Sequence, residues 1–139
     1  MIQGAEAEVE IQEDKVIKKR PEKKYRHPEL DKRIRKQRTQ TEFSSMQKAR
    51  RNDVNVPKVE KESDYVLNME KIEGKTLQED FRPEKMIEVG RNVQKLHGSG
   101  LVHGDLTTKN IMSNGETTLI DFGLSGDSTG VEDRAVDLH

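Results

Sequence analysis

The chain has 139 residues, of which 30% are hydrophobic and 37% are charged. A chain of this length forms one small domain, or the two lobes of one, around a thin core. No apolar run approaches the roughly 18 residues of a membrane span, and the N-terminus lacks the basic and apolar segments of a secretory signal. The absence of cysteine excludes disulfides, zinc–thiolate sites and thiol catalysis. These features favour a cytoplasmic protein.

The net charge of −1 conceals an uneven distribution of charge along the chain. Residues 1–14 carry a net charge of −5, residues 15–51 one of +11, and residues 52–139 one of −7. A basic block of this kind is typical of a solvated helix face. It is also typical of a patch that binds RNA or the acidic surface of a partner protein. Composition leaves both interpretations of residues 15–51 open.

Strands and one long helix are predicted in the first half of the chain. Ala7 to Ile11 alternates apolar and acidic residues, the pattern of a half-buried strand, and Lys15 to Lys19 is the returning strand. Pro21 ends that strand because proline cannot donate a ladder hydrogen bond. Pro28 to Arg51 then predicts a helix whose inner sector contains Leu30, Ile34, Thr41, Ser45 and Ala49. Two further strands are predicted at residues 56–60 and 64–70.

The second half predicts a helix followed by a hairpin. Apolar residues at spacings of three and four indicate a helix from Pro83 to about His97, which glycines then end. Residues 110–113 and 117–122 flank Asn114-Gly115, a strong signal for a tight hairpin turn. The order of strands, helix, strands, helix and hairpin predicts an α+β fold.

The densest group of reactive side chains is HGDLTTKN, His103 to Asn110, followed by DFG at residues 121–123. Asp105 and Asn110 bracket a loop and Asp121 follows a predicted strand, positions from which a scaffold presents side chains to a ligand. Carboxylate and amide oxygens are ligands that Mg²⁺ shares with phosphates. Asp105 is then free to accept the proton of an attacking hydroxyl or to orient a water. Asp and Asn also form turns with their own backbone, but these three at kinase-like spacings favour a catalytic site.

These motifs resemble the catalytic and metal-binding loops of the protein kinase superfamily, with Gly104 in place of the usual arginine. His103 is expected to pack and hydrogen-bond within the loop. The segments IQGAEAEV, VIKKR, YRHPELD, RTQTE and VEDRAVDL narrow the resemblance to the small atypical serine/threonine kinases of the KEOPS complex, relatives of the RIO kinases. That complex helps to make threonylcarbamoyladenosine on tRNA. The resemblance implies a two-lobed, kinase-like fold, with a minimal N-terminal lobe to about residue 70 and a truncated C-terminal lobe over about 75–139.

The resemblance also assigns the catalytic and metal-binding roles. Lys18 matches the strand lysine that binds the α- and β-phosphates of ATP, and Glu42 matches the helix glutamate that pairs with this lysine. Asp105 matches the catalytic aspartate. Asn110, a further catalytic residue, and Asp121 match the Mg²⁺ ligands. On the predicted helix, Glu42 lies at the border of the apolar sector, from which it can point inward.

Further positions resemble an adenine pocket. Met69 corresponds to the gatekeeper, the residue beside the adenine ring. The backbone of Glu70 and Ile72 corresponds to the hinge that bonds adenine. Ile2 and Val16 correspond to the apolar ceiling over the base.

The chain departs from typical kinases in ways that bear on its substrate. Gly4 is the one glycine left of the usual G-x-G-x-x-G phosphate loop, and Gly104 removes the guanidinium that grips a phosphorylated activation loop. Between Gly123 and Glu132 there is no A-P-E motif. These departures favour ATP hydrolysis or phosphorylation of a dedicated partner over broad protein phosphorylation. Lys109 could reach a phosphate oxygen or point to solvent.

The resemblance therefore implies ATP and Mg²⁺ as cofactors, for phosphoryl transfer or ATP hydrolysis during tRNA modification. The expected partners are the tRNA-modifying catalytic subunit and other subunits of KEOPS, with tRNA contact through basic residues 15–51 as a further expectation. We expect the chain alone to be a weak enzyme that a partner stabilises. Three alternatives stay open: a RIO-type ribosome-assembly ATPase, a small-molecule phosphotransferase, and a non-catalytic module that binds RNA or a partner.

Overall fold

The computed structural model describes residues 2–3, 7–123 and 125–127. The first half of the chain forms a five-stranded antiparallel sheet in the order β1-β2-β3-β5-β4. The central strand is β3, which pairs with β2 on one side and with β5 on the other, so the predicted hairpin of β2 and β3 is confirmed. The strands are β1 (Ile2–Gln3), β2 (Glu8–Ile11), β3 (Lys15–Lys19), β4 (Val59–Ser63) and β5 (Val66–Glu70).

The strands predicted at residues 56–60 and 64–70 begin later in the structure. The strand expected at 56–60 begins at Val59, because Pro57 has no N–H to donate and the carbonyl of Val56 accepts a hydrogen bond from Arg50 Nη1 at 3.1 Å. The strand expected at 64–70 begins at Val66, because residues 64–65 form the turn between β4 and β5. Both strands nevertheless exist at the predicted places in the chain.

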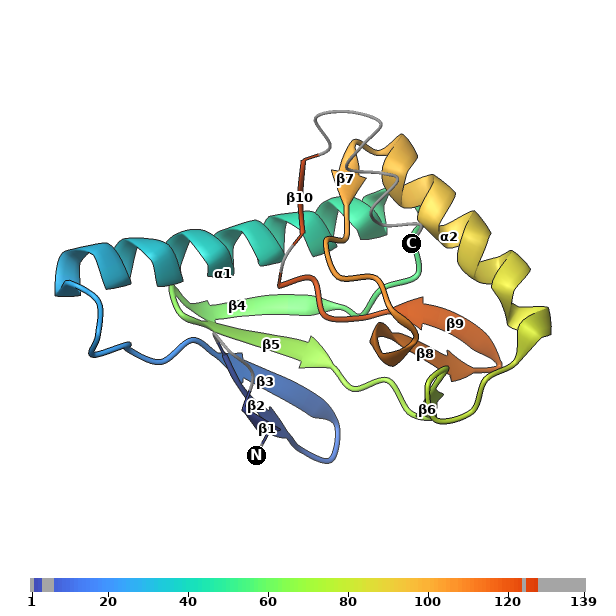
Figure 1. Ribbon diagram of the computed structural model, residues 1–139, viewed down its shortest axis with the longest axis horizontal. Helices are drawn as coiled ribbons and strands as arrows, with labels where there is room; N and C mark the ends of the chain where they lie inside the picture. The colour runs from blue at the N-terminus through green and yellow to red at the C-terminus, as the bar shows by residue number, and fades with distance from the viewer. Residues whose placement is uncertain (1, 4–6, 124, 128–139) are drawn as a thin grey trace.

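Helix α1 (Pro28–Arg51) is the longest element and lies along the sheet beside β4 and β5 (Figure 1). The imidazole of His27 caps it by accepting a hydrogen bond from the amide of Glu29 at 3.3 Å. Acidic residues occupy its first turn and basic residues its last, which complements the helix dipole. The sequence predicted this helix with its bounds.

The buried face of α1 differs from the predicted sector. Leu30, predicted to face inward, is 45% exposed. The buried residues include Ser45 and Ala49, as predicted, but otherwise lie elsewhere on the helix: Asp31, Thr39, Glu42 and Met46. Two of these are carboxylates, which a count of apolar residues cannot place on the inner face, because ion pairs rather than hydrophobicity hold them there.

The second half of the chain packs helix α2 against a three-stranded sheet in the order β6-β8-β9 (Figure 1). The predicted helix at 83–97 is divided into a 3₁₀ turn, η1, followed by α2. A separate two-stranded sheet joins β7 to β10. The elements are β6 (Lys75–Thr76), η1 (Pro83–Lys85), α2 (Met86–Gly98), β7 (Leu101–Val102), η2 (Thr108–Asn110), β8 (Ile111–Asn114), β9 (Glu116–Leu119) and β10 (Gly126–Asp127).

The hairpin predicted around Asn114-Gly115 is confirmed, with β8 and β9 antiparallel. Gly115 has φ 75°, a backbone angle that glycine adopts without steric cost. The second strand ends at Leu119 rather than at the predicted Phe122. Asp121 has φ 59°, which breaks the extended backbone and turns the chain there.

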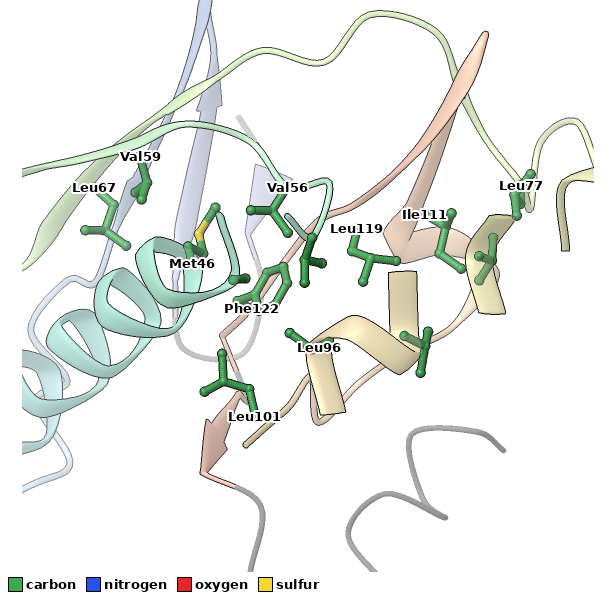
Figure 2. Close-up of a cluster of buried hydrophobic side chains, with 14 residues drawn as sticks. Met46, Val56, Val59, Leu67, Leu77, Leu96, Leu101, Ile111, Leu119 and Phe122 are labelled. Carbon is green, nitrogen blue, oxygen red and sulfur yellow. The ribbon is translucent and has the colours of Figure 1, made fainter. Parts of the chain in front are cut away.

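One hydrophobic core joins the two halves of the molecule (Figure 2). Met46 of α1 and Leu67 of β5 pack in the same cluster as Leu96 of α2, Leu119 of β9 and Phe122. Each of these side chains is at most 1% exposed. No helix among the described residues is long and apolar enough to span a membrane.

Asn55, in the loop between α1 and β4, fastens the first half of the chain to the second. Its amide donates to Asn92 Oδ1 at 3.3 Å, and its carbonyl accepts from the amide of Leu119 at 3.0 Å. Its side-chain nitrogen donates to the carbonyl of Thr117 at 2.6 Å and to Thr118 Oγ1 at 3.3 Å. These bonds and the shared core hold the two sheets in one arrangement.

Candidate active site

A buried ion pair joins the central strand to the long helix. Lys18 of β3 and Glu42 of α1 are separated by 3.0 Å between Nζ and Oε2, and the Glu42 side chain is fully buried. Lys18 pairs with Leu67 in the sheet register, so its side chain shares a face with a core residue and points toward the helix. The pairing implied by the resemblance is present, and Glu42 points inward as its position on the helix allowed.

A second cation at this site, Arg20, was missed from the sequence. Its Nη2 donates to the other carboxylate oxygen of Glu42, Oε1, at 3.0 Å, and its side chain is only 3% exposed. Arg20 stands two residues after Lys18, the spacing that brings side chains to one face of an extended strand. That spacing was the available signal, but Pro21, the next residue, predicted the end of the strand there.

Asp121 brings a second carboxylate to the same lysine. Its Oδ1 lies 3.2 Å from Lys18 Nζ and accepts a hydrogen bond from the amide of Gly123 at 3.3 Å. Burial acts to raise the pKa of Asp121, but the charge and hydrogen bond of Lys18 and the hydrogen bond from the Gly123 amide outweigh it and hold this pKa below its ordinary 3.8. Asp121 is therefore ionised at neutral pH, with a side chain that is 51% exposed and accessible to a ligand.

Gly123 suits the crowded space around this pair. A Cβ at this position would lie 3.1 Å from Lys18 Nζ, 3.3 Å from Asp121 Oδ1 and 3.5 Å from Arg20 Nη2. The contact with Arg20 would be an ordinary van der Waals contact, whereas Lys18 and Asp121 would each have to shift by a few tenths of an ångström to admit a methyl group. The glycine of the DFG motif thus leaves room for the charge cluster.

The loop of the HGDLTTKN motif is organised around Asp105 and Asn110. Nδ2 of Asn110 donates to the carbonyl of Asp105 at 2.8 Å and to Asp105 Oδ2 at 3.3 Å. Asn110 is buried, at the end of the short turn η2, whereas Asp105 is half-buried. The side-chain nitrogen of Asn110 is therefore bonded within the protein, and the side-chain oxygen can bind a ligand.

His103 connects this loop to the turn that carries Asp121. It is fully buried, its Nε2 lies 2.7 Å from the carbonyl of Ile120, and its Nδ1 accepts from the amide of Asp105 at 3.2 Å. Its ring also packs against that of Phe122, with centroids 4.6 Å apart. The expected packing and bonding of His103 within the loop is confirmed.

Most of the residues assigned to adenine lie near the start of β3 and at the end of β5, strands that are neighbours in the sheet. Val16 pairs with Met69 across β3 and β5, which places the two side chains on one face, and Met69 packs against the core. The amide of Glu70 donates to the carbonyl of Lys58 at 2.8 Å. Ile72, just beyond β5, is half-buried. Of the two remaining positions, Ile2 contributes backbone pairing with Val9, and Gly4 lies outside the described residues.

The fold and the charge cluster together define a protein-kinase-like domain. The structure superposes on that of the Rio2 kinase from Chaetomium thermophilum with a TM-score of 0.79 and 15% identity, covering 98% of this chain and 52% of the other. The ADP/Mg²⁺-phosphoaspartate complex of the same kinase gives a TM-score of 0.73 and 14% identity, over 97% and 52% of the two chains. The expected kinase-like α+β fold is confirmed.

The sequence matches the RIO domain over residues 7–129, and the chain belongs to this family. It is 40% identical to a probable serine/threonine-protein kinase BUD32 homolog of Archaeoglobus fulgidus, covering 98% of this chain and 70% of that protein. It is 47% identical to a probable bifunctional tRNA threonylcarbamoyladenosine biosynthesis protein of Methanoculleus marisnigri, over 98% of this chain and 26% of that protein. The chain thus spans about a quarter of the bifunctional relative, and the expected family is confirmed.

Proposed function

We propose that this chain binds ATP with Mg²⁺ and acts as an atypical serine/threonine kinase or ATPase in the formation of threonylcarbamoyladenosine on tRNA. The observation that carries the proposal is the position of Lys18, between a buried carboxylate at 3.0 Å and an accessible one at 3.2 Å. The names of the relatives support the kinase class and the tRNA modification. They favour this reading over a ribosome-assembly ATPase or a small-molecule phosphotransferase.

The residues present suit a magnesium ion that is shared with nucleotide. Asp121 offers an ionised, half-exposed carboxylate, and Asn110 offers an amide oxygen whose nitrogen is already bonded to Asp105. Mg²⁺ commonly takes one or two protein oxygens and completes its shell with phosphates and water. When bound, it would neutralise phosphate charge during transfer. Lys18 would hold the α- and β-phosphates.

Asp105 would accept the proton that the attacking group releases. The attacking oxygen, from a hydroxyl or a water, forms a bond to the γ-phosphorus while the bond to the β–γ bridging oxygen breaks and ADP leaves. The proton released by the attacking oxygen passes to Asp105. Because Asn110 donates to Oδ2 of Asp105, the carboxylate is oriented with Oδ1 left for the acceptor. Positioning of this kind accounts for much of the rate in such reactions.

The adenine ring would lie between the two halves of the domain, beside Met69. The amide of Glu70 is already bonded to Lys58, so the carbonyl of Glu70 is the group we assign to adenine, together with the backbone of Ile72. Val16 would cover the ring from the sheet, with Ile2 beside it. Gly4 would contribute to the loop over the phosphates. The division between lobes would fall between residues 70 and 75, at this nucleotide site.

The basic block would contact tRNA through only part of its charge. Asp31 is fully buried and binds Arg35 Nε at 2.8 Å and Arg26 Nε at 3.2 Å, so these two arginines serve the fold. The cations left exposed at the start of α1 and in the preceding loop are Lys24, Lys32, Arg33 and Lys36. We infer that these meet RNA phosphates, that the tRNA-modifying subunit and other KEOPS subunits bind the chain, and that it works in the cytoplasm.

The proposal is tested by titrating the chain with MgATP in a calorimeter and by measuring phosphate release. Lys18→Met should weaken MgATP binding at least about tenfold, because a hydrogen bond between charged groups contributes roughly 1.5–3 kcal/mol. Lys19→Met is the matched control, since Lys19 is the next residue on the same strand and is exposed. Unchanged binding in Lys18→Met, or equal loss in both variants, would contradict the proposed site.

A further inference from the structure

Two cations share the buried carboxylate of Glu42, one on each oxygen. Lys18 Nζ lies 3.0 Å from Oε2 and Arg20 Nη2 lies 3.0 Å from Oε1. The side chains of Lys18, Arg20 and Glu42 are 9%, 3% and 0% exposed. A carboxylate removed from water in this way depends on its partners, because an uncompensated buried charge is strongly destabilising.

Lys18 would have to share its one ammonium group among Glu42, Asp121 and phosphate if it also binds nucleotide. Its ammonium group has three N–H donors, and Glu42 and Asp121 already engage two of them. A nucleotide would add further negative charge to the same ammonium. Without Arg20, Lys18 alone would compensate the buried charge of Glu42 while it also bound the phosphates.

Arg20 contributes charge to the site at a cost to its own hydrogen bonding. Its Nε–H is buried and has no acceptor among the described residues, which is unfavourable for stability. Its backbone is nevertheless fixed on both sides, with the amide donating to the carbonyl of Tyr65 at 2.9 Å and the carbonyl accepting from Arg35 Nη1 at 3.2 Å. The guanidinium of Arg20 is thus held in place although one of its N–H groups lacks an acceptor. This arrangement suits a role in pairing with Glu42 better than a role in packing the core.

We propose that Arg20 is a positioning residue of the nucleotide site, which keeps Glu42 neutralised and so frees Lys18 to bind the phosphates of ATP. Arg20 acts through Glu42 and Lys18 and does not touch the nucleotide. The proposal rests on the proposed function, because it requires a nucleotide at Lys18. It predicts that the loss of Arg20 weakens binding of phosphates specifically, and that removing the charge of Glu42 reverses the loss.

The test compares adenosine with MgADP as probes for the wild-type chain, Arg20→Met and the double variant Arg20→Met with Glu42→Gln. In Arg20→Met we expect adenosine affinity to stay within about twofold and MgADP affinity to fall about tenfold, the effect of one charged hydrogen bond. In the double variant MgADP affinity should rise at least about threefold above that of Arg20→Met, because no buried carboxylate then competes for Lys18. Arg20→Lys, which retains a positive charge, should lie between Arg20→Met and wild type and replaces Arg20→Met if that variant does not fold.

Three results would overturn the role of Arg20. They are wild-type MgADP affinity in Arg20→Met, an equal loss for adenosine and MgADP, and no recovery in the double variant. The second indicates a merely structural residue, and the third indicates direct contact with phosphate. A wild-type chain that binds neither adenosine nor MgADP would refute the proposed function itself. If the wild-type chain binds MgADP and Arg20→Met binds it equally well, only the role of Arg20 is refuted.

Discussion

Replacing Asp121 with asparagine should separate Mg²⁺-dependent from Mg²⁺-independent nucleotide binding. The variant keeps the size of the side chain and tolerates the left-handed backbone at this position, φ 59°. It removes the carboxylate that we assign to the metal, and it removes one negative charge that faces the phosphates. MgADP affinity should therefore fall, whereas affinity for ADP without metal should stay constant or rise.

The effect of this change on stability should be small. At 3.2 Å, the attraction between Lys18 and Asp121 is about 1.3 kcal/mol at the dielectric constant of water. Half of the Asp121 side chain is exposed, so screening and side-chain entropy reduce the net contribution below about 1 kcal/mol. The melting temperature should fall by no more than about 3 °C. Since the pKa of Asp121 is lowered, this contribution is present at neutral pH and is lost as the pH falls below 3.8 toward the folded value.

The assay is a titration of ADP with and without Mg²⁺, followed by thermal unfolding of the same samples. Asp53→Asn is the matched control, because Asp53 also has a left-handed backbone, φ 62°, and lies away from the site in the turn after α1. The control should bind MgADP as wild type does. If Asp121→Asn retained the full enhancement of ADP affinity by Mg²⁺, the assignment of this carboxylate to the metal would be wrong.

Three further changes probe the rest of the site and the basic block. Asp105→Ala should slow phosphate release at least about 100-fold with ATP affinity nearly intact, since a proton acceptor acts in the transfer step; parallel loss of ATP affinity contradicts that role. Asp31→Ala should lower the free energy of unfolding by about 3–5 kcal/mol in urea titrations, because two arginines lose their buried partner. Charge reversal at Lys24 and Arg33 should reduce the slope of the logarithm of tRNA affinity against the logarithm of salt concentration by about 0.7–0.9 per lost phosphate contact. An unchanged slope would show that these residues do not contact the phosphates.

The order of the longer strands and helices was predictable because each has a local signal, whereas the two-residue strands β1, β6, β7 and β10 were not predicted. The alternation before β3, the proline at the start of α1 and Asn114-Gly115 in the hairpin are properties of short segments. The inner face of α1 was not predictable in the same way. Asp31 is buried because Arg26 and Arg35 pair with it, and hydrophobic periodicity carries no information about ion pairs. Likewise Lys18 and Glu42 were paired by resemblance, whereas Arg20, the last residue of VIKKR, was given no role from the sequence and was found at the site only in the structure.

The bonds made by Asn55 have a consequence for the thermodynamics of ligand binding. Its amide, its carbonyl and its side chain all reach the second half of the chain, so the separation of the two sheets is set before any ligand arrives. A nucleotide that binds between the two sheets would enter a preformed site, and its binding would bury little additional protein surface. The heat-capacity change on binding should then reflect the surface of the ligand itself, and be much smaller than that of a protein whose halves close around it.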